Sequence, residues 1–456
     1  MIIDKLLENN KIPMHMPGHK RNTALAPYLK RLGADLDITE IDGFDNLHAP
    51  NGIIYESMQK AAELRNSKSA FYLVGGTTAG ILASVSAVID DGDKVIVSRN
   101  CHKSVYNALE LNNAETVFVM PKIDAKTGIA GSICPWDIEQ AIKENSDAKL
   151  VILTSPTYEG VTSDIKAICN ISHSYNIPVL VDGAHGAHLG FSEEFLPDNI
   201  RQQADISVES LHKTLPSLTQ TAVCYVNSDL VDIDSLADKL SVFQSSSPSY
   251  LLMASIDGCI NLLADKKDEL FSDWKERLDY FYEKCKDLKN LKILEKSEAF
   301  FDLDKTKIVI LTKSGPWLSE KLREMGIECE MTAPGHVVAM TGMGDTIQML
   351  SYFATCLLKI DKDAEKWQEN KGFTPFLPRK EMEIKDAKKR EYEWVEVKDS
   401  LDRISAGYVY AYPPGVPIIA PGEVISEEIK TLLLTYIKAD SGILQNIPEN
   451  KVKVVK

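Results

Sequence analysis

The chain has 456 residues, a length that accommodates one large domain together with one or two smaller ones. Its 44% apolar and 26% charged residues match an ordinary globular protein and exclude a disordered or collagen-like chain. The formal net charge is −15, and the basic residues are scattered along the sequence, so a nucleic-acid-binding surface is not expected.

Membrane and export signals are not found in the sequence. No apolar run reaches about 18 residues, and the first residues have no basic segment followed by a long apolar stretch. The eight cysteines never form a Cys-x-x-Cys pair, which favours reduced cysteines that lie mostly in a core. The sequence therefore predicts a soluble cytoplasmic protein that binds neither a membrane nor nucleic acid.

From about residue 55, short strand-like runs alternate with helical periods. The runs predict strands at 69–74, 94–98, 116–119, 150–154, 178–181, 205–209 and 222–226. Helices are expected between them, among them 78–89, one from about residue 102, and 163–175. Several of the strands are almost continuously apolar, as parallel strands covered by helices on both faces are. This alternation predicts a doubly wound α/β domain with a mainly parallel sheet.

A second pattern begins near residue 290. Its strand, helix, strand, strand, helix order predicts a small α+β domain, with elements at 307–311, 316–324, 327–331, 336–339 and 345–358. Residues 360–400 are highly charged and carry Pro375 and Pro378, which predicts an exposed connector with one helix. Residues 1–55 show no convincing periodic element. We therefore expect an N-terminal arm at 1–55, a large domain at 56–285 and a small C-terminal domain, with the connector, at 286–456.

The first candidate site is the turn Gly75-Gly76-Thr77-Thr78, which follows a predicted strand and opens a helix. Backbone N–H groups at a helix start, beside two hydroxyl groups, can hold an anion, and glycines let a phosphate approach closely. An ordinary strand-to-helix turn with a threonine cap would explain the same residues. The turn is a candidate phosphate site.

The second candidate site is Asp182-Gly183-Ala184-His185, at the end of the apolar run 178–181. Parallel α/β sheets bind ligands at the carboxyl ends of their strands, so Asp182 is placed to meet a cofactor. Once partly buried, its carboxylate needs a cationic partner. His185 and His188 have the spacing of metal ligands, but neither an HExxH pattern nor a cysteine cluster accompanies them. No metal is therefore expected, and a hydrogen-bonded structural role is the default for His188.

Two further candidates follow predicted strands. Lys213, in Ser210-Leu211-His212-Lys213-Thr214, comes directly after the strand 205–209, and desolvation and nearby positive charge can make such an amine a nucleophile for a Schiff base. A surface lysine is the alternative and the commoner fate of a lysine. His102 opens the helix after the strand 94–98, and its alternative is a capping or core histidine.

Together, in this order and fold, these sites resemble the pyridoxal-phosphate enzymes of the aspartate-aminotransferase fold, and more specifically the Orn/Lys/Arg decarboxylase family. The similarity covers nearly the whole chain and includes Met16-Pro17-Gly18-His19-Lys20, Asp45-Asn46-Leu47-His48-Ala49-Pro50, Ser155-Pro156-Thr157-Tyr158, Ser245-Ser246-Ser247-Pro248-Ser249-Tyr250 and Tyr412-Pro413-Pro414-Gly415-Val416-Pro417 with Pro421-Gly422-Glu423. Two departures are small: Gly183 stands where many members have glutamate, and Gly-Gly-Thr-Thr replaces the more usual Gly-Thr-Ser. The chain resembles the short biosynthetic type, similar to bacterial arginine decarboxylases.

The resemblance implies a role for each candidate residue. Lys213 would hold pyridoxal 5'-phosphate covalently, Asp182 would keep the ring nitrogen protonated, and His102 would stack on the ring, with all three counted as catalytic. His185 would brace the Asp182 side. The phosphate would be held by the turn at Gly76, Thr77 and Thr78, by Ser210 and His212, and by Ser246 of a neighbouring subunit, so a homodimer or a larger homo-oligomer is implied.

The implied reaction is decarboxylation of a basic L-amino acid, with arginine as first choice, then lysine or ornithine. Either Lys213 or His212 would return a proton to Cα, and Glu423 would contact the distal cation of the substrate. At Glu423, a position in the first turn of a helix at 424–437 is the alternative. An aminotransferase that clamps the substrate carboxylate with Arg403, or a non-catalytic binding protein, are the alternatives for the whole chain.

Overall fold

The computed structural model describes residues 1–369, 377–412, 415–439, 443–445 and 448–456, so Pro375, Pro413 and Pro414 lie outside the described residues. The chain forms two compact units, each assembled from segments distant in the sequence. The first unit contains Met1–Val88, Pro178–Asp273 and Gly342–Gly344, and the second contains Ile89–Ile177, Trp274–Thr341 and Asp345–Lys456. The domain limits expected from the sequence, at 55 and 285, do not coincide with these units and stay a prediction.

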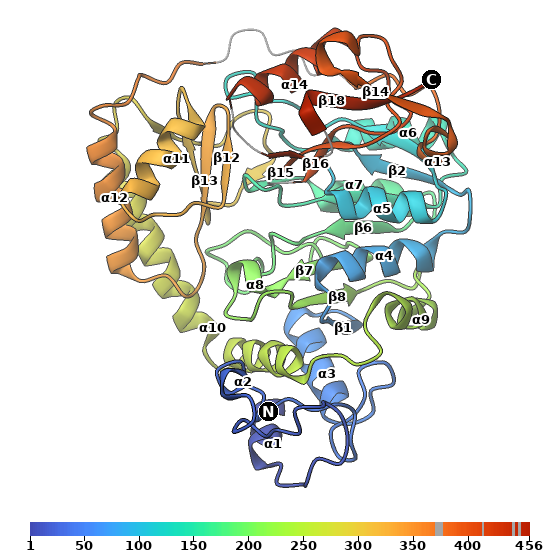
Figure 1. Ribbon diagram of the computed structural model, residues 1–456, viewed down its shortest axis with the longest axis vertical. Coiled ribbons are helices and arrows are strands. Elements are labelled where there is room, and N and C mark those ends of the chain that lie inside the picture. Colours follow the sequence, from blue (N-terminus) through green and yellow to red (C-terminus); the bar gives the residue numbers. More distant parts are fainter. Residues whose placement is uncertain (370–376, 413–414, 440–442, 446–447) are drawn as a thin grey trace. The chain divides into compact units, whose positions relative to one another are not determined.

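The first unit holds the N-terminal helices and four strands (Figure 1). Its elements are α1 (Ile2–Glu8), α2 (Pro27–Lys30), α3 (Ile53–Arg65), β1 (Ser69–Leu73), α4 (Gly76–Val88), β6 (Val179–Asp182), β7 (Ile206–Ser210), α8 (Leu211–Thr214), β8 (Ala222–Val226), α9 (Ile233–Phe243) and the part of α10 (Tyr250–Cys285) that ends at Asp273.

The four strands of the first unit lie in the order β1-β8-β7-β6 (Figure 1). β6 and β7 are parallel, whereas β8 is antiparallel to both β7 and β1. Every residue of β6, β7 and β8 is buried, including the polar residues Ser207, Glu209 and Ser210 of β7. Helix α4 packs closely on the strands at Gly80. A Cβ at this position would lie 2.6 Å from Leu73 Cδ1 and 2.7 Å from Val208 Cγ1, so only glycine fits without a shift. The carboxyl ends of β6 and β7 carry Asp182 and Ser210.

Helix α1 corrects the prediction that residues 1–55 form an arm without periodic elements. It spans only seven residues and buries Ile2 and Leu6, one turn apart. The N–H of Ile2 donates to Asp257 Oδ2 at 2.7 Å, so a buried carboxylate of α10 binds the start of the helix. A single buried pair in so short a helix leaves too weak a pattern to read from the sequence.

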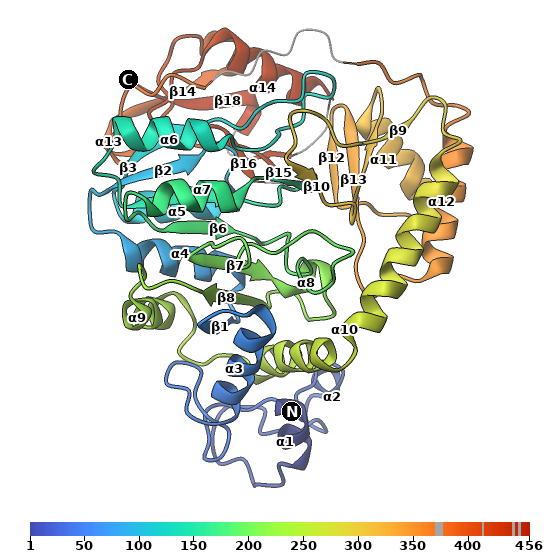
Figure 2. The same cartoon turned by 180° about the vertical axis from the view of Figure 1, so that it is seen from behind.

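The second unit contains the remaining elements (Figure 2). They are β2 (Lys94–Ser98), α5 (Lys103–Leu111), β3 (Glu115–Val119), α6 (Pro135–Glu144), β4 (Leu150–Thr154), β5 (Val161–Thr162), α7 (Ile165–His173), the rest of α10, β9 (Lys292–Ile293), β10 (Asp302–Leu303), β11 (Lys307–Leu311), α11 (Gly315–Glu324), β12 (Met331–Ala333), β13 (His336–Met340), α12 (Ile347–Ile360), α13 (Ile384–Lys389), β14 (Tyr392–Glu396), the 3-10 turn Val397–Asp399, β15 (Val409–Tyr412), β16 (Val416–Ile419), α14 (Glu427–Ala439), β17 (Ile443–Gln445), the 3-10 turn Pro448–Asn450 and β18 (Lys451–Val455).

In the second unit, β2 lies between β3 and β4 and is parallel to both. A separate antiparallel sheet has the order β12-β13-β11-β9, and helices α11 and α12 lie beside it in Figure 2. Their common core includes Ile308, Ile310, Leu318, Val337 and Leu357. Near the C-terminus, β15 pairs with β16 and β17, and β14 pairs with β18. Together with the parallel β6–β7 pair of the first unit, this is the α/β fold with a separate small α+β part that the sequence predicts.

Several element boundaries need correction. The strand predicted at 327–331 is wrong over most of its length, since β12 begins only at Met331. The helix predicted at 424–437 begins later, at Glu427. Helix α10, 36 residues long, was not predicted, although Phe271, Trp274, Leu278 and Phe281 are buried at helical spacing. Within the described ranges, no helix combines the length and the apolar character needed to cross a bilayer.

Candidate active site

Lys213 lies at the end of the strand β7, on the short helix α8. Leu211 and Thr214 of this helix are buried. The N–H of Met343 donates to the Thr214 carbonyl at 3.1 Å, so this hydrogen bond ties α8 to the segment Gly342–Gly344. Lys213 is only half-buried, and its Nζ lies 2.8 Å from His185 Nε2. Lys213 is thus held beside an imidazole and differs from the freely solvated surface lysine that was the alternative.

Asp182 ends β6, the strand next to β7, and is 3% exposed. Its Oδ1 accepts a hydrogen bond from the N–H of Ala184 at 3.2 Å. Burial raises the pKa of Asp182, while the charge of Lys213 and this hydrogen bond act to lower it. The cationic partner that the sequence led us to expect is therefore Lys213. A second cation near this carboxylate would further stabilise its ionised form.

The glycine–threonine turn belongs to the same unit and forms the start of α4. Gly76 has φ +70, a conformation that favours glycine, and its N–H donates to the Gln220 carbonyl at 2.9 Å. Thr77 Oγ1 lies 3.5 Å from Ser210 Oγ, and Thr78 is exposed at the helix start. Hydroxyl groups from the ends of two elements therefore meet at a helix N-terminus.

His212 follows Ser210 by two residues and is oriented by the loop before β8. Its Nδ1 lies 2.9 Å from the Thr221 carbonyl oxygen, so Nδ1 carries the proton of the neutral ring. Nε2 is then the nitrogen with a lone pair. His188, in contrast, is fully buried and packs in a T-shaped pair with Phe195, with ring centres 6.0 Å apart, in keeping with a structural role. Among the described residues, no group of three or more His, Cys, Asp or Glu side chains is arranged to hold a metal ion.

The structure thus brings together Gly76, Thr77, Asp182, His185, Ser210, His212 and Lys213 within the first unit. Ser246 belongs to this unit too and is exposed, next to Ser245, whose carbonyl lies 2.8 Å from His48 Nε2. His102 and Glu423 belong to the second unit. His102 is the N-cap of α5, where its Nδ1 accepts from the N–H of Ser104 at 3.2 Å.

Glu423 differs most from its expected surroundings. It lies four residues before α14, so the first-turn position at 424–437 is wrong. The carboxylate is fully buried and bonds Arg99, with Oε1 3.0 Å from Nε and Oε2 2.9 Å from Nη2. The N–H of Ala420 also donates to Oε2 at 2.7 Å. A contact of Glu423 with the substrate's cation stays a prediction, but Arg99 already neutralises this carboxylate.

Glu423→Gln tests which role the carboxylate has. The variant leaves the Arg99 cation buried without its anion, so we expect the free energy of unfolding to fall by about 3–5 kcal/mol. The melting temperature measures this loss, and Arg99→Met combined with Glu423→Met, which removes both charges, should recover most of it. A variant with an unchanged melting temperature and a lower kcat/KM for basic amino acids would instead return Glu423 to the substrate site.

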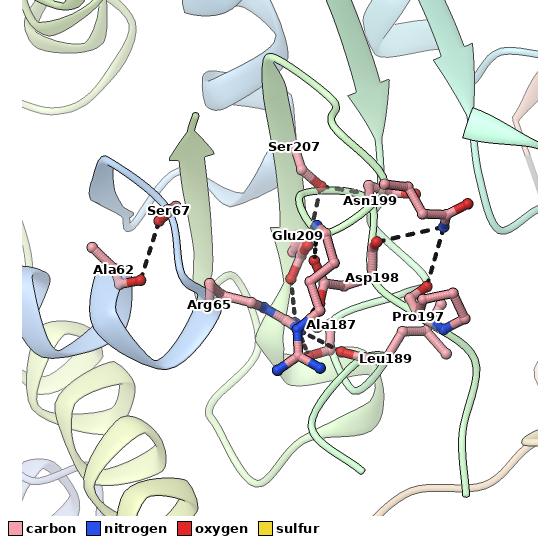
Figure 3. A network of polar contacts seen from close by, with 12 residues as sticks. Ala62, Arg65, Ser67, Ala187, Leu189, Pro197, Asp198, Asn199, Ser207 and Glu209 are labelled. Carbon is pink, nitrogen blue, oxygen red and sulfur yellow. Dashed lines mark hydrogen bonds and ion pairs between the residues drawn. The ribbon is translucent and has the colours of Figure 1, made fainter. Parts of the chain in front are cut away.

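A buried charge cluster that the sequence did not reveal lies in the first unit and includes Glu209, the residue that directly precedes Ser210 (Figure 3). Arg65, Asp198 and Glu209 are each 1% exposed. Arg65 Nη2 lies 2.5 Å from Glu209 Oε2, and Arg65 Nη1 lies 3.7 Å from Asp198 Oδ2. The side chain of Arg201 is about half-exposed, and its Nε lies 3.4 Å from Asp198 Oδ2. The one available signal was Glu209 itself, an acidic residue inside an otherwise uncharged strand.

The cluster has a predicted effect on the pH dependence of stability. Burial, followed by Asp198, raises the pKa of Glu209 from 4.5 to about 7, although Arg65 acts to lower it. The folded protein therefore keeps a proton on Glu209 up to about pH 7, whereas the unfolded chain releases this proton near pH 4.5. The stabilisation that results from this proton is complete below pH 4.5. It is lost as the pH rises through 7, which lowers the free energy of unfolding by up to about 3 kcal/mol.

Thermal unfolding of the wild type and of Glu209→Gln, which cannot titrate, measures this effect. We expect the stability of the wild type relative to the variant to be greater at pH 5.5 than at pH 8. A stability difference that stays constant over this range would show that Glu209 keeps one ionisation state throughout.

The first unit offers the groups that a phosphorylated aldehyde with a basic ring nitrogen requires. They are a half-buried amine with an imidazole at 2.8 Å, a buried carboxylate next to it, and a helix start with N–H groups and hydroxyls. Such a donor set fits pyridoxal 5'-phosphate. The class of protein defined by this fold and site is thus a pyridoxal-phosphate-type α/β enzyme.

Comparisons with known proteins identify the family. Residues 3–348 match the model of the Orn/Lys/Arg decarboxylase major domain, and residues 368–453 match that of the C-terminal domain. The chain is 31% identical to an arginine decarboxylase of Bacillus subtilis (100% of this chain, 96% of that protein) and 32% identical to one of Bacillus anthracis (97% and 93%). The structure of the Escherichia coli constitutive lysine decarboxylase matches with a TM-score of 0.83 at 18% identity, covering 100% of this chain and 82% of that chain.

The chain belongs to the Orn/Lys/Arg decarboxylase family. It is an amino-acid decarboxylase, and the family implies pyridoxal 5'-phosphate as its cofactor. The resemblance, the fold class and the enzyme class inferred from the sequence are confirmed. The roles of the individual site residues stay predictions.

Proposed function

We propose that this decarboxylase removes the α-carboxylate of L-arginine, with lysine and ornithine as the second choices, using pyridoxal 5'-phosphate held by Lys213. The observation that carries the proposal is the contact of Lys213 Nζ with His185 Nε2 at 2.8 Å, beside the buried Asp182. The choice of arginine is supported by relatives named arginine decarboxylase that are 31–32% identical over nearly the whole chain.

Lys213, His185 and Asp182 have different roles in the proposed reaction. Bound pyridoxal phosphate supplies an electron sink for the pair of electrons that CO2 leaves behind on Cα. Lys213 would hold it covalently, and His185, whose Nε2 lies 2.8 Å from Nζ, would accept the proton that the Lys213 ammonium must lose before its amine can react. Burial raises the pKa of Asp182, but the positive charge of a protonated ring nitrogen would keep its carboxylate ionised, and the carboxylate would in turn hold the proton at that nitrogen.

The phosphate-binding part of the proposal uses the start of α4. The N–H groups of this helix, the hydroxyls of Thr77 and Thr78, and Ser210 offer donors to a dianion, and the helix dipole favours it. His212, with its Nδ1 proton directed at Thr221, is fixed in orientation next to this cradle. After CO2 has left, Lys213 or His212 returns a proton to Cα.

An aminotransferase, the alternative considered from the sequence, needs a cation that clamps the substrate's α-carboxylate. Its candidate Arg403 is bonded elsewhere: Nη2 lies 2.7 Å from Glu393 Oε1 and donates to the Val455 carbonyl at 2.9 Å. The family assignment and this pairing favour decarboxylation.

The wider setting is part of the same proposal. We propose that the protein works in the cytoplasm in the biosynthesis of polyamine precursors, because none of the eight cysteines forms a disulfide and the chain covers 96% and 93% of two Bacillus arginine decarboxylases. The exposed Ser245–Ser247 run is the segment proposed to reach a partner in a homodimer or larger homo-oligomer. Light scattering of the purified chain measures the oligomeric state, and a monomer would contradict the shared site.

Assays with one substrate at a time test the choice of amino acid. Purified protein with added pyridoxal phosphate is incubated with arginine, lysine or ornithine, and agmatine, cadaverine or putrescine is quantified. We expect the highest kcat/KM for arginine. A higher value for lysine or ornithine would overturn the choice of substrate but leave the reaction type in place.

A further inference from the structure

Arg65, the last residue of α3, reaches into the protein with a fully buried guanidinium group (Figure 3). It stacks at 4.1 Å over the centre of the Phe191 ring and lies 5.5 Å from that of Tyr225. Its Nη1 donates to the Leu189 carbonyl, and its Nη2 donates to the Ala187 carbonyl and to Glu209. Neither the sequence nor the proposed mechanism gives this residue a role.

The groups bonded by Arg65 belong to the two segments that carry the candidate site. Ala187 and Leu189 lie in the loop 183–190, which starts directly after Asp182 and carries His185. Glu209 directly precedes Ser210 and lies four residues before Lys213. One side chain therefore connects the loop of His185 to the strand that leads to Lys213.

The loop 183–190 packs tightly against its neighbours at both ends, which restricts its conformation. Gly190 has φ +75, and a Cβ on it would lie 2.0 Å from Asp198 Oδ2. A Cβ on Gly183 would lie 2.8 Å from Asn199 Nδ2 and 3.0 Å from Ser207 Oγ. Both ends of the loop thus pack directly on the polar cluster around Arg65, which also accounts for the glycine at position 183.

We propose that Arg65 is a positioning residue that sets the contact between His185 and Lys213, and with it the readiness of the Lys213 amine to bind cofactor. Only arginine suits this place, because a planar fork with several donors can bond two carbonyl oxygens and a carboxylate at once. A lysine keeps the charge but lacks the fork. The link to the cofactor rests on the proposed function, whereas the contacts of Arg65 do not.

Two variants separate positioning from simple stabilisation. Arg65→Lys keeps a cation for Glu209 and Asp198 and removes the fork. Arg65→Met combined with Glu209→Gln removes the cation together with its nearest buried carboxyl group, so it limits the destabilisation caused by an unpaired group. The matched control is Lys307→Met in the second unit, which breaks the buried ion pair of Lys307 with Asp304, 2.7 Å long.

The full chain, stripped of cofactor, is titrated with pyridoxal 5'-phosphate, and the dissociation constant is read from the visible absorbance, with melting temperatures measured in parallel. We expect both Arg65 variants to raise the dissociation constant about tenfold or more, because the Lys213 amine must be correctly oriented to bind the cofactor. We expect Lys307→Met to lower the melting temperature and keep the wild-type dissociation constant.

The outcomes distinguish this inference from the proposed function. If both Arg65 variants bind pyridoxal phosphate within about twofold of the wild type, a change near 0.4 kcal/mol, Arg65 only stabilises the fold and the inference is overturned. If Lys307→Met weakens cofactor binding as much as they do, the effect is a general loss of stability, which also overturns it. If the wild type itself does not bind pyridoxal phosphate, the proposed function fails first.

Discussion

Lys213→Ala is expected to abolish decarboxylation and to remove the visible absorbance of lysine-bound pyridoxal phosphate. The Lys213 amine is held 2.8 Å from His185 and close enough to Asp182 to affect its pKa, so its loss removes the covalent anchor from the site. Absorbance spectra and borohydride trapping followed by peptide mapping measure the anchor directly.

A second lysine of the same unit serves as the control. Lys68, paired on the surface with Asp229 at 2.6 Å, should tolerate replacement by alanine with its activity and absorbance unchanged. A borohydride-trapped adduct that persists in Lys213→Ala would show that another lysine holds the cofactor.

Asp182→Asn is expected to retain the cofactor and to lose more than about tenfold in kcat, at least about 1.4 kcal/mol in the barrier. Lys213 and the turn at Gly76 remain to bind the cofactor. An amide, however, cannot balance a protonated ring nitrogen as a buried carboxylate does, and charge pairs shielded from water are strong. Steady-state kinetics at saturating arginine and cofactor measure the effect. A variant with kcat within about tenfold of the wild type would exclude Asp182 from this role.

Much of the fold could be predicted because its strands have simple sequences. β2, β4 and β8 have the bounds that the sequence predicts, since a strand buried on both faces is apolar along most of its length. Helix α10 was missed although Phe271, Trp274, Leu278 and Phe281 follow a helical period, because many charged residues separate them. The strand predicted at 327–331 lies mostly in the irregular segment before β12, where Ile327 and Cys329 are partly buried against the core without joining a sheet.

The candidate site could be predicted in part, for a reason that lies in the topology. Asp182 and Ser210 end neighbouring parallel strands, and ligands bind at the carboxyl ends of such strands. The positions of Asp182, His185 and Lys213 just after or at strand ends therefore predict that they share one site. The partners of these residues were out of reach. Arg65 meets Leu189, Ala187 and Glu209 from more than 120 positions away, and a single sequence carries no signal for such a contact.

The partner of Glu423 could not be predicted from the sequence either. Its sequence context, a rigid proline-rich segment before a helix, indicated either a substrate contact or a helix end. The structure instead pairs its carboxylate with Arg99, which lies 324 positions earlier. A buried carboxylate needs a partner, and only the fold determines whether that partner is a substrate or another side chain.

Carbon-labelled substrate tests the central claim most directly. The purified chain is supplied with pyridoxal 5'-phosphate and L-arginine labelled at the carboxylate, and the labelled CO2 and the agmatine are quantified together. We expect equal amounts of both, dependent on added cofactor and absent with Lys213→Ala. Conversion of arginine to its keto acid with retention of the label, or turnover that continues in Lys213→Ala, would contradict a decarboxylase that uses Lys213.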